Sequence, residues 1–194
     1  MEKNLRARLT RLRQANPTKV VEVWAQDEAR LGLKPIARRV WAPKGQRPRW
    51  CGRTRYQWLY LYGFVRPKTG NTFGVLLPRV RAERMSEALA EFASGADPGG
   101  KKVLVVLVDN AGWHRAKALV VPSNVALHFL PPCTPELQPA EPLWPLVRES
   151  VANRSVGRID RLKAIIRDRV SYLASHPDEV QPRVGFHWAV GLER

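Results

Sequence analysis

Two aspartates stand where the sequence predicts that apolar strands end. Asp27 follows the run Val20–Gln26, and Asp109 follows Val103–Val108, which is apolar at every position. Ligands gather at the carboxyl ends of strands in α/β sheets. If the two strands are neighbours, their carboxylates repel each other, and a divalent cation relieves the repulsion. Hard oxygen ligands without clustered histidine or cysteine favour Mg²⁺ or Mn²⁺ over Zn²⁺. Each aspartate alone is more typical of a turn or a helix cap, and it is the occurrence of two in one basic protein that favours a functional site.

A third acidic side chain follows a proline-rich stretch. Glu141 comes after residues 130–139, an extended and stiff segment that can hold a loop over the strand ends. A helix predicted at about 143–152 places Glu141 near its N-terminus, where a carboxylate can also simply stabilise the helix dipole. Pro142 and Pro145 predict that this helix begins late or irregularly.

The elements that must position these acids are predicted from hydrophobic periodicity. Residues 1–17 are expected to form a basic N-terminal helix and linker, followed by a domain over 18–194. Strands are predicted at 20–26, 36–42, 56–65, 72–77, 103–108 and 125–130, and helices at 3–15, 83–93, 111–120, 143–152 and 159–174. A β-meander followed by alternating helices and strands predicts an α/β fold, with a mixed central sheet flanked by helices.

The basic side chains are concentrated in the first part of the chain. The net charge is +16, and residues 1–55 hold 15 basic and 4 acidic side chains. Such a surface attracts polyanions, because each neutralised phosphate releases counterions. We expect a nucleic acid partner; the alternatives are a solvated surface, an acidic protein or a lipid. The candidates for phosphate contacts are Arg30, Arg38, Arg39, Lys44, Arg47, Arg49, Arg53 and Arg55.

Composition excludes several other classes of protein. With 194 residues and 44% hydrophobic residues, the chain is long and apolar enough for one domain with a core. Its longest aliphatic run, Val103–Val108, is too short to span a membrane, and the arginine-rich N-terminal segment is not expected to be a signal peptide. Cys51 and Cys133 are too few for a disulfide framework or a four-cysteine zinc site.

Four segments of the chain resemble the signature blocks of DDE transposases, in particular the bacterial insertion-sequence branch related to mariner elements. They are Trp24–Leu33, Arg39–Gly45, Val108–His114 and Leu130–Trp144. They occur in the family's order between about residues 18 and 150, with Asp109 and Glu141 separated by 32 positions. The resemblance implies a ribonuclease-H-like fold and two Mg²⁺ (or Mn²⁺) ions. The implied catalytic, metal-binding acids are Asp27, Asp109 and Glu141, with Asn110 and His114 as supporting residues.

The same resemblance implies metal-dependent cleavage and strand transfer of DNA. The expected partners are transposon ends, target DNA and a second copy of the chain, in the bacterial cytoplasm near the nucleoid. Full-length members carry N-terminal helix-turn-helix modules, and only about 18 residues precede the first strand here, so we expect poor sequence specificity. Two alternatives stay open: a catalytically decayed remnant that only binds DNA or a partner, and another ribonuclease-H-like nuclease such as a resolvase. His114 on its own could also be a structural histidine bonded to backbone.

Overall fold

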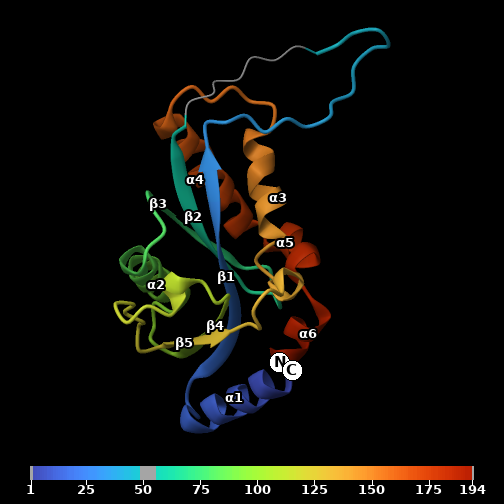
Figure 1. Cartoon of the computed structure of the whole chain (residues 1–194). Coiled ribbons are helices and arrows are strands. Elements are labelled where there is room, and N and C mark those ends of the chain that lie inside the picture. Colours follow the sequence, from blue (N-terminus) through green and yellow to red (C-terminus); the bar gives the residue numbers. More distant parts are fainter. Residues whose placement is uncertain (1, 49–55, 194) are drawn as a thin grey trace.

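A mixed five-stranded sheet forms the centre of the molecule (Figure 1). The structure is a computed structural model, and it describes residues 2–48 and 56–193. The strands are β1 (Val20–Gly32), β2 (Trp58–Val65), β3 (Thr72–Leu77), β4 (Lys102–Val108) and β5 (Val125–Phe129). Their order is β3-β2-β1-β4-β5; β2 is antiparallel to β1 and β3, whereas β4 is parallel to β1 and β5. The predicted fold class is therefore confirmed.

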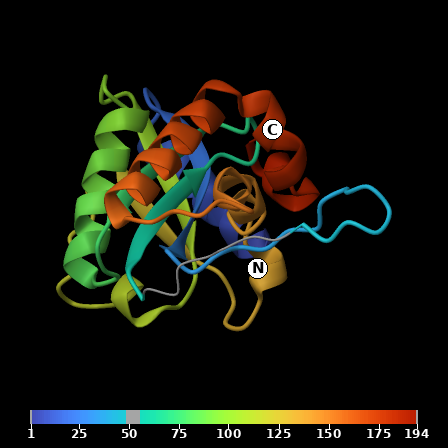
Figure 2. The same ribbon diagram turned by 90° about the horizontal axis from the view of Figure 1, so that it is seen from above.

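Helices cover both faces of this sheet. One face packs against α2 (Ala82–Ala96), through Met85, Leu89 and Phe92. The other face packs against four helices and the C-terminal end of the chain, and Figure 2 shows α2 and α5 on opposite sides of the sheet. The four helices are α1 (Glu2–Ala15), α3 (Leu143–Arg148), α4 (Ile159–Ser175) and α5 (Pro177–Val184); α6 (His187–Val190) follows them. Coverage of both faces explains why β4 is apolar from Val103 to Val108.

The longest strand, β1, changes its partner along its length. Val20–Ala25 pairs with β4, and Ala25–Gly32 pairs with β2. The sequence predicted that this strand ends before Asp27, which is wrong, because hydrogen bonding to β2 continues the strand to Gly32. What ends near Asp27 is only the pairing with β4. The consecutive charges at 27 and 28 therefore lie within a strand, on its opposite faces.

Two other predicted elements are absent from the described residues. Over 36–42 the structure has only an isolated bridge between Ile36 and Ala152, because no strand lies beside this segment. The arm, which we define as residues 37–48, is exposed throughout and projects from the body (Figures 1 and 2). The helix predicted over 111–120 is reduced to a 3₁₀ turn at Gly112–His114. Glycine is a weak helix former, and the side chain of His114 is bonded back to Asp109.

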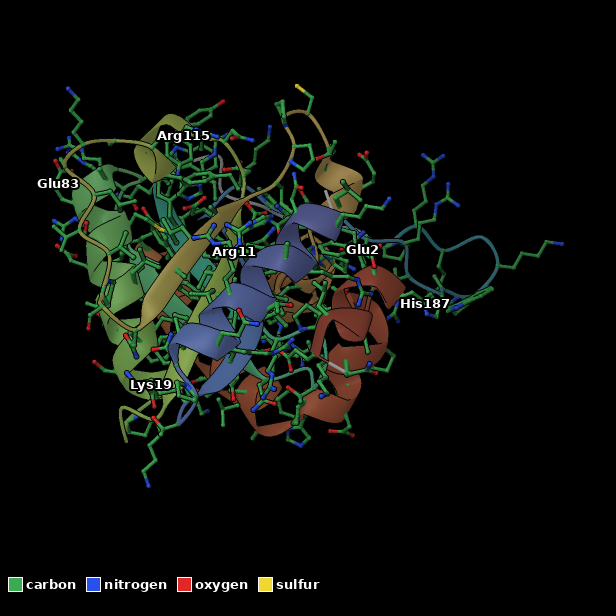
Figure 3. The ribbon with its side chains drawn as sticks, turned by 90° about the horizontal axis from the view of Figure 1, so that it is seen from below. Glu2, Arg11, Lys19, Glu83, Arg115 and His187 are labelled. Atoms are coloured by element: carbon green, nitrogen blue, oxygen red, sulfur yellow. The ribbon has the colours of Figure 1, made fainter. Side chains whose placement is uncertain are left out.

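The N-terminal helix packs onto the same body. Leu5 and Leu9 of α1 are fully buried in the core. Arg13 donates a hydrogen bond to the carbonyl oxygen of Leu192 at 3.0 Å, so α1 lies beside the C-terminal end of the chain (Figures 1 and 3). No helix within residues 2–48 and 56–193 combines the length and the hydrophobicity that spanning a bilayer requires.

A buried group of charges joins the C-terminal end to β1. The Glu193 carboxylate accepts a 2.6 Å bond from the backbone N–H of Val23, at a point where β1 is not yet paired with β2. The same carboxylate binds the Arg66 guanidinium, which also binds Glu22 at 3.0 Å. The Glu193 side chain is 4% exposed. It therefore satisfies a strand N–H and an arginine in a site with little access to water.

We expect Glu193→Gln to lower the free energy of unfolding by about 1–3 kcal/mol, because it removes a buried charge-assisted interaction. Urea unfolding monitored by tryptophan fluorescence measures the change. Glu2→Gln is the control, since Glu2 pairs with Arg6 on an exposed surface where such pairs contribute little. An equal effect of the two substitutions would argue against a structural role of Glu193.

Candidate metal centre

The three acids identified in the sequence line one cleft of about 330 Å³, together with the proline-rich segment before α3. Asp27 and Asp109 meet there because of the sheet register. The last pair between β1 and β4 is Ala25 with Leu107, and each aspartate stands two residues beyond that pair. Beyond it the two strands separate, so that the cleft opens between their ends. Asn110, Cys133, Gln138 and Glu141 also line it.

The side chain of Asp27 is held by a residue of α3, which is distant from Asp27 in the sequence. The indole Nε1 of Trp144 donates a 2.7 Å hydrogen bond to Asp27 Oδ2. Gly63 lies opposite Asp27 on β2, and a Cβ atom at Gly63 would come within 2.6 Å of the Trp144 ring. The absence of a side chain at this position therefore lets the indole reach Asp27. One carboxylate oxygen of Asp27 is bonded to protein in this way.

Burial raises the pKa of Asp27 to about 7, although the Trp144 hydrogen bond acts in the opposite direction. The negative charges of Glu28 and Glu141 add to the rise. A carboxylate that is costly to ionise in the folded protein is one that a bound cation would stabilise strongly.

Asp109 is oriented by His114. The Nδ1 atom of His114 lies 2.8 Å from Asp109 Oδ1, which also accepts a 2.9 Å bond from the backbone N–H of Ala111. The hydrogen bond to His114 lowers the pKa of Asp109. The Asp109 side chain remains 54% exposed. Because Oδ1 has two protein partners, Oδ2 is the oxygen left for a ligand in the cleft.

Glu28 holds the other side of the His114 ring. Its Oε1 atom lies 3.1 Å from His114 Nε2 and also 3.1 Å from the indole nitrogen of Trp113. The side chains of Glu28 and His114 are 6% and 1% exposed. Burial disfavours the charged imidazolium, but the hydrogen bonds to Asp109 and Glu28 outweigh it and raise the pKa of His114 to about 9. At neutral pH His114 is therefore a cation between two carboxylates.

Asn110 links the ends of two strands rather than pointing at the acids. Its Nδ2 donates a 2.6 Å bond to the carbonyl of Leu130, just after β5. Its Oδ1 accepts hydrogen bonds from Arg115, whose guanidinium lies over the ring of Phe129. Figure 3 shows Arg115 beside the short turn that lies next to α2. Asn110 thus fixes the position of the chain that follows Asp109.

Glu141 lies in the turn before α3. The helix begins at Leu143, as predicted, but it ends at Arg148 and is followed by a 3₁₀ turn over Glu149–Val151. Gln138 anchors the turn on the sheet. Its side-chain Nε2 donates a 3.0 Å bond to the backbone carbonyl of Gln26, and its backbone carbonyl accepts a bond from the backbone N–H of Glu141. The Glu141 side chain is exposed in the cleft.

The donor set suits a hard divalent cation. Asp27 and Asp109 each commit one oxygen to protein donors and leave the other, and Glu141 adds a third carboxylate to the same cleft. In the described parts of the chain, however, no three acidic, histidine or cysteine side chains are already gathered closely enough to hold an ion. The residues fit a metal that draws the carboxylates together, rather than a closed cage formed in advance.

The predicted DNA-binding cations fall into three groups. Arg30, near the end of β1, has its guanidinium 4.4 Å from the centre of the Trp58 ring. Four others are exposed on the arm: Arg38, Arg39, Lys44 and Arg47. The remaining three, Arg49, Arg53 and Arg55, lie outside the described residues.

Sequence reasoning missed the roles of Trp144, Gln138 and Glu28. Each acts through a partner that is distant in the chain: 117 positions separate Trp144 from Asp27, and 86 separate His114 from Glu28. Glu28 and Trp144 lie inside two of the segments that resemble DDE transposases, and this was the only signal in the sequence that pointed to them. No local pattern indicates which distant side chain they contact.

The mixed sheet with helices on both faces and an acidic cleft between β1 and β4 defines a ribonuclease-H-like fold. Residues 22–163 match the family described as DDE superfamily endonuclease, and the chain belongs to this family. The recognition of the DDE superfamily from these sequence blocks is therefore confirmed.

Solved structures of Mos1 mariner transposase share this fold. The Mos1 catalytic domain has a TM-score of 0.57 at 14% identity, over 99% of this chain and 91% of that one. A pre-cleavage Mos1 transpososome has a TM-score of 0.61 at 15% identity, and the paired-end complex with Mg has 0.61 at 17%. Each covers 99% of this chain, but only 61% and 59% of the respective Mos1 chain.

A curated relative comes from Sinorhizobium fredii (strain NBRC 101917 / NGR234). The uncharacterized protein y4pE/y4sA is 43% identical over 98 residues, which is 50% of this chain and 71% of that protein. The Mos1 chains in the paired-end complexes are longer than this chain, which spans about 60% of their length.

Proposed function

We propose that this chain is the catalytic domain of a DNA transposase that cleaves phosphodiester bonds and transfers the cut strand. The observation that carries the proposal is that Asp27, Asp109 and Glu141, remote in sequence, line one cleft in a member of the DDE endonuclease family. The solved Mos1 paired-end complexes with Mn, with Mg and with a left transposon end support a divalent metal and transposon DNA as partners.

The proposed roles of the residues follow from their contacts. Two Mg²⁺ or Mn²⁺ ions held by the three carboxylates would activate a water or a DNA 3′-hydroxyl and stabilise the leaving oxygen. Trp144 keeps one oxygen of Asp27 in place, and His114 does the same for Asp109. Asn110 fixes the strand ends that form the cleft wall. The protein's contribution is therefore to position charge around the scissile phosphate.

We also propose the partners, location and organisation of the chain. The cations of the arm and Arg30 would contact the backbone phosphates of transposon ends and target DNA, which positions DNA without reading its sequence. Trp41 on the arm is fully exposed, and a second copy of the chain is a candidate to cover it in a homodimer. The bacterial cytoplasm near the nucleoid would be the site of action. Residues 1–17 would form an N-terminal helix and linker that precede the catalytic domain over 18–194.

The test is cleavage and joining of labelled duplex DNA with Mg²⁺ or Mn²⁺ by the wild-type protein and by Asp109→Asn. The variant should lose activity by about three orders of magnitude, because it removes a charged metal ligand. Asp160→Asn, which neutralises an exposed carboxylate on α4, is the matched control and should stay active. Equal activity of wild type and Asp109→Asn would contradict the proposal.

A catalytically decayed, DNA-binding remnant is the second candidate function. It is favoured by the exposed position of Glu141 and by the lack, within the described residues, of a ready-made group of metal ligands. Calorimetric titration with Mn²⁺ in the presence of DNA separates the two candidates. Uptake of two ions supports the enzyme, whereas DNA binding without uptake of metal supports the remnant.

A further inference from the structure

A second hollow, of about 230 Å³, lies where β1 ends and α3 passes beside it. Its apolar floor includes Val151 and Leu162, and three cations line it: Arg30, Lys34 and Arg148. We call it the Arg148 hollow. No acidic side chain is among its lining residues.

The three cations of the Arg148 hollow are available for an anion. Among the ion pairs of the described residues, none joins Arg30, Lys34 or Arg148 to a carboxylate. The nearest acidic neighbour of Arg148 in sequence, Glu149, lies 4.0 Å from Arg38. The guanidinium of Arg30 lies over the Trp58 ring, which restrains its position, and within the described residues it donates no hydrogen bond to another side chain.

The wall of the hollow is built in advance. Asn153 follows α3 and the 3₁₀ turn at Glu149–Val151, and it holds the loop after β1. Its side chain bonds to the backbone N–H and carbonyl of Arg38 at 2.8 and 3.2 Å. The backbone N–H of Asn153 donates to the carbonyl of Ile36 at 2.9 Å. Asn153 has a φ of 54°, a conformation that asparagine tolerates better than most residues. Lys34 and Arg148 are thus brought to the same hollow without a ligand.

The hollow lies close to the candidate metal centre. Arg148 is four residues beyond Trp144 on α3, which is about 6 Å along the helix, and Trp144 is the hydrogen-bond partner of Asp27. Arg30 is three residues beyond Asp27 on β1, about 10 Å along the strand, and its side chain leaves the opposite face of the strand at the rim of the hollow. On a DNA strand with a rise of about 3.4 Å per nucleotide, these distances correspond to about two or three nucleotides.

We propose that the Arg148 hollow binds a backbone phosphate of the DNA, about two or three nucleotides from the phosphate at the metal centre. The assignment rests on the proposed function and deepens it, because it names a second anchoring point for the same substrate. Three unpaired cations, one of them a stacked arginine, match a phosphodiester anion in charge and geometry. Lys34 and Arg148 would fix the register of the strand across the cleft without reading its bases.

The test is DNA binding without divalent metal, measured by fluorescence anisotropy over a range of NaCl concentrations. The variant Lys34→Gln/Arg148→Gln should bind a labelled duplex about tenfold more weakly at moderate salt, and its slope of log K against log [NaCl] should be smaller by about one. The matched control is Lys101→Gln/Arg183→Gln, which removes the same charges from exposed positions elsewhere, Lys101 being next to the start of β1. The control should keep the wild-type slope.

An unchanged affinity and slope in the hollow variant would overturn the assignment, and so would an equal loss in the control pair. If the double variant does not fold, Lys34→Gln alone tests the same hollow, since Lys34 is exposed; its affinity should fall about threefold, and no fall would overturn the assignment. At saturating DNA the hollow variant should still cleave when divalent metal is added, whereas Asp109→Asn should bind and not cleave. A failure of the hollow is thereby distinguished from a failure of the proposed function.

Discussion

Asp27→Asn is expected to abolish metal-dependent DNA cleavage and, at the same time, to make the metal-free protein more stable above pH 7. The first effect follows from the loss of a charged ligand, and we expect activity to fall by about three orders of magnitude. The second follows from the environment of Asp27. Burial raises its pKa to about 7, so the folded protein holds this carboxyl protonated at a pH where the unfolded chain does not.

The direction of the pH dependence can be derived from that shift. A group with a raised pKa in the folded state contributes stability that is fully present below its unfolded pKa, near 3.8, and that is lost as the pH rises through about 7. The asparagine is neutral throughout and can still accept the Trp144 hydrogen bond. The stability of the variant relative to wild type should therefore be similar near pH 4 and higher by about 4 kcal/mol near pH 8.

Urea unfolding of both proteins across this pH range, with chelator present, measures the difference. Added Mg²⁺ should then stabilise the wild type and leave Asp27→Asn unchanged, because only the wild type offers the ionised ligand. A wild-type stability that rises between pH 4 and 8 relative to the variant would contradict the assigned environment of Asp27.

Glu28→Ala is expected to weaken Mn²⁺ binding and DNA cleavage by about 10- to 100-fold, although Glu28 is not one of the three acids in the cleft. Glu28 holds His114 from the side opposite Asp109, and partners that orient a metal ligand contribute on this scale. Without Glu28, His114 loses one of the two hydrogen bonds that raise its pKa to about 9. Its pKa should fall, and Asp109 should face a weaker and less rigid cation.

NMR titration of the His114 ring in the metal-free protein measures the fall in pKa, and calorimetry with Mn²⁺ measures the change in affinity. Glu28→Gln should retain more activity than Glu28→Ala, because an amide oxygen can still accept from the imidazole. Glu136→Ala removes an exposed carboxylate of the proline-rich segment and serves as the control. A His114 pKa that stays near 9 in Glu28→Ala would show that Glu28 does not act through the imidazole.

Much of the fold could be predicted from the sequence, because its signals are local. The apolar run at 103–108 predicted a strand covered on both faces, and the period-3.6 pattern at 159–174 predicted α4, whose helix spans Ile159–Ser175. The two predicted elements that the described residues lack, at 36–42 and 111–120, are segments whose conformation depends on tertiary partners. No strand of the described residues lies beside the first, and the second ends after one turn because of the contacts of His114.

The sequence by itself determined which residues could bind a hard cation, the family to which the chain belongs and the basic character of its first third. These properties depend on residue type and order. Only the tertiary structure decided that β1 exchanges β4 for β2 beside Asp27, that Trp144 reaches this acid over Gly63, and that Glu28 faces His114. The physical reason is that hydrogen bonds and burial between residues about 100 positions apart are set by how the layers pack, which no local pattern of side chains specifies.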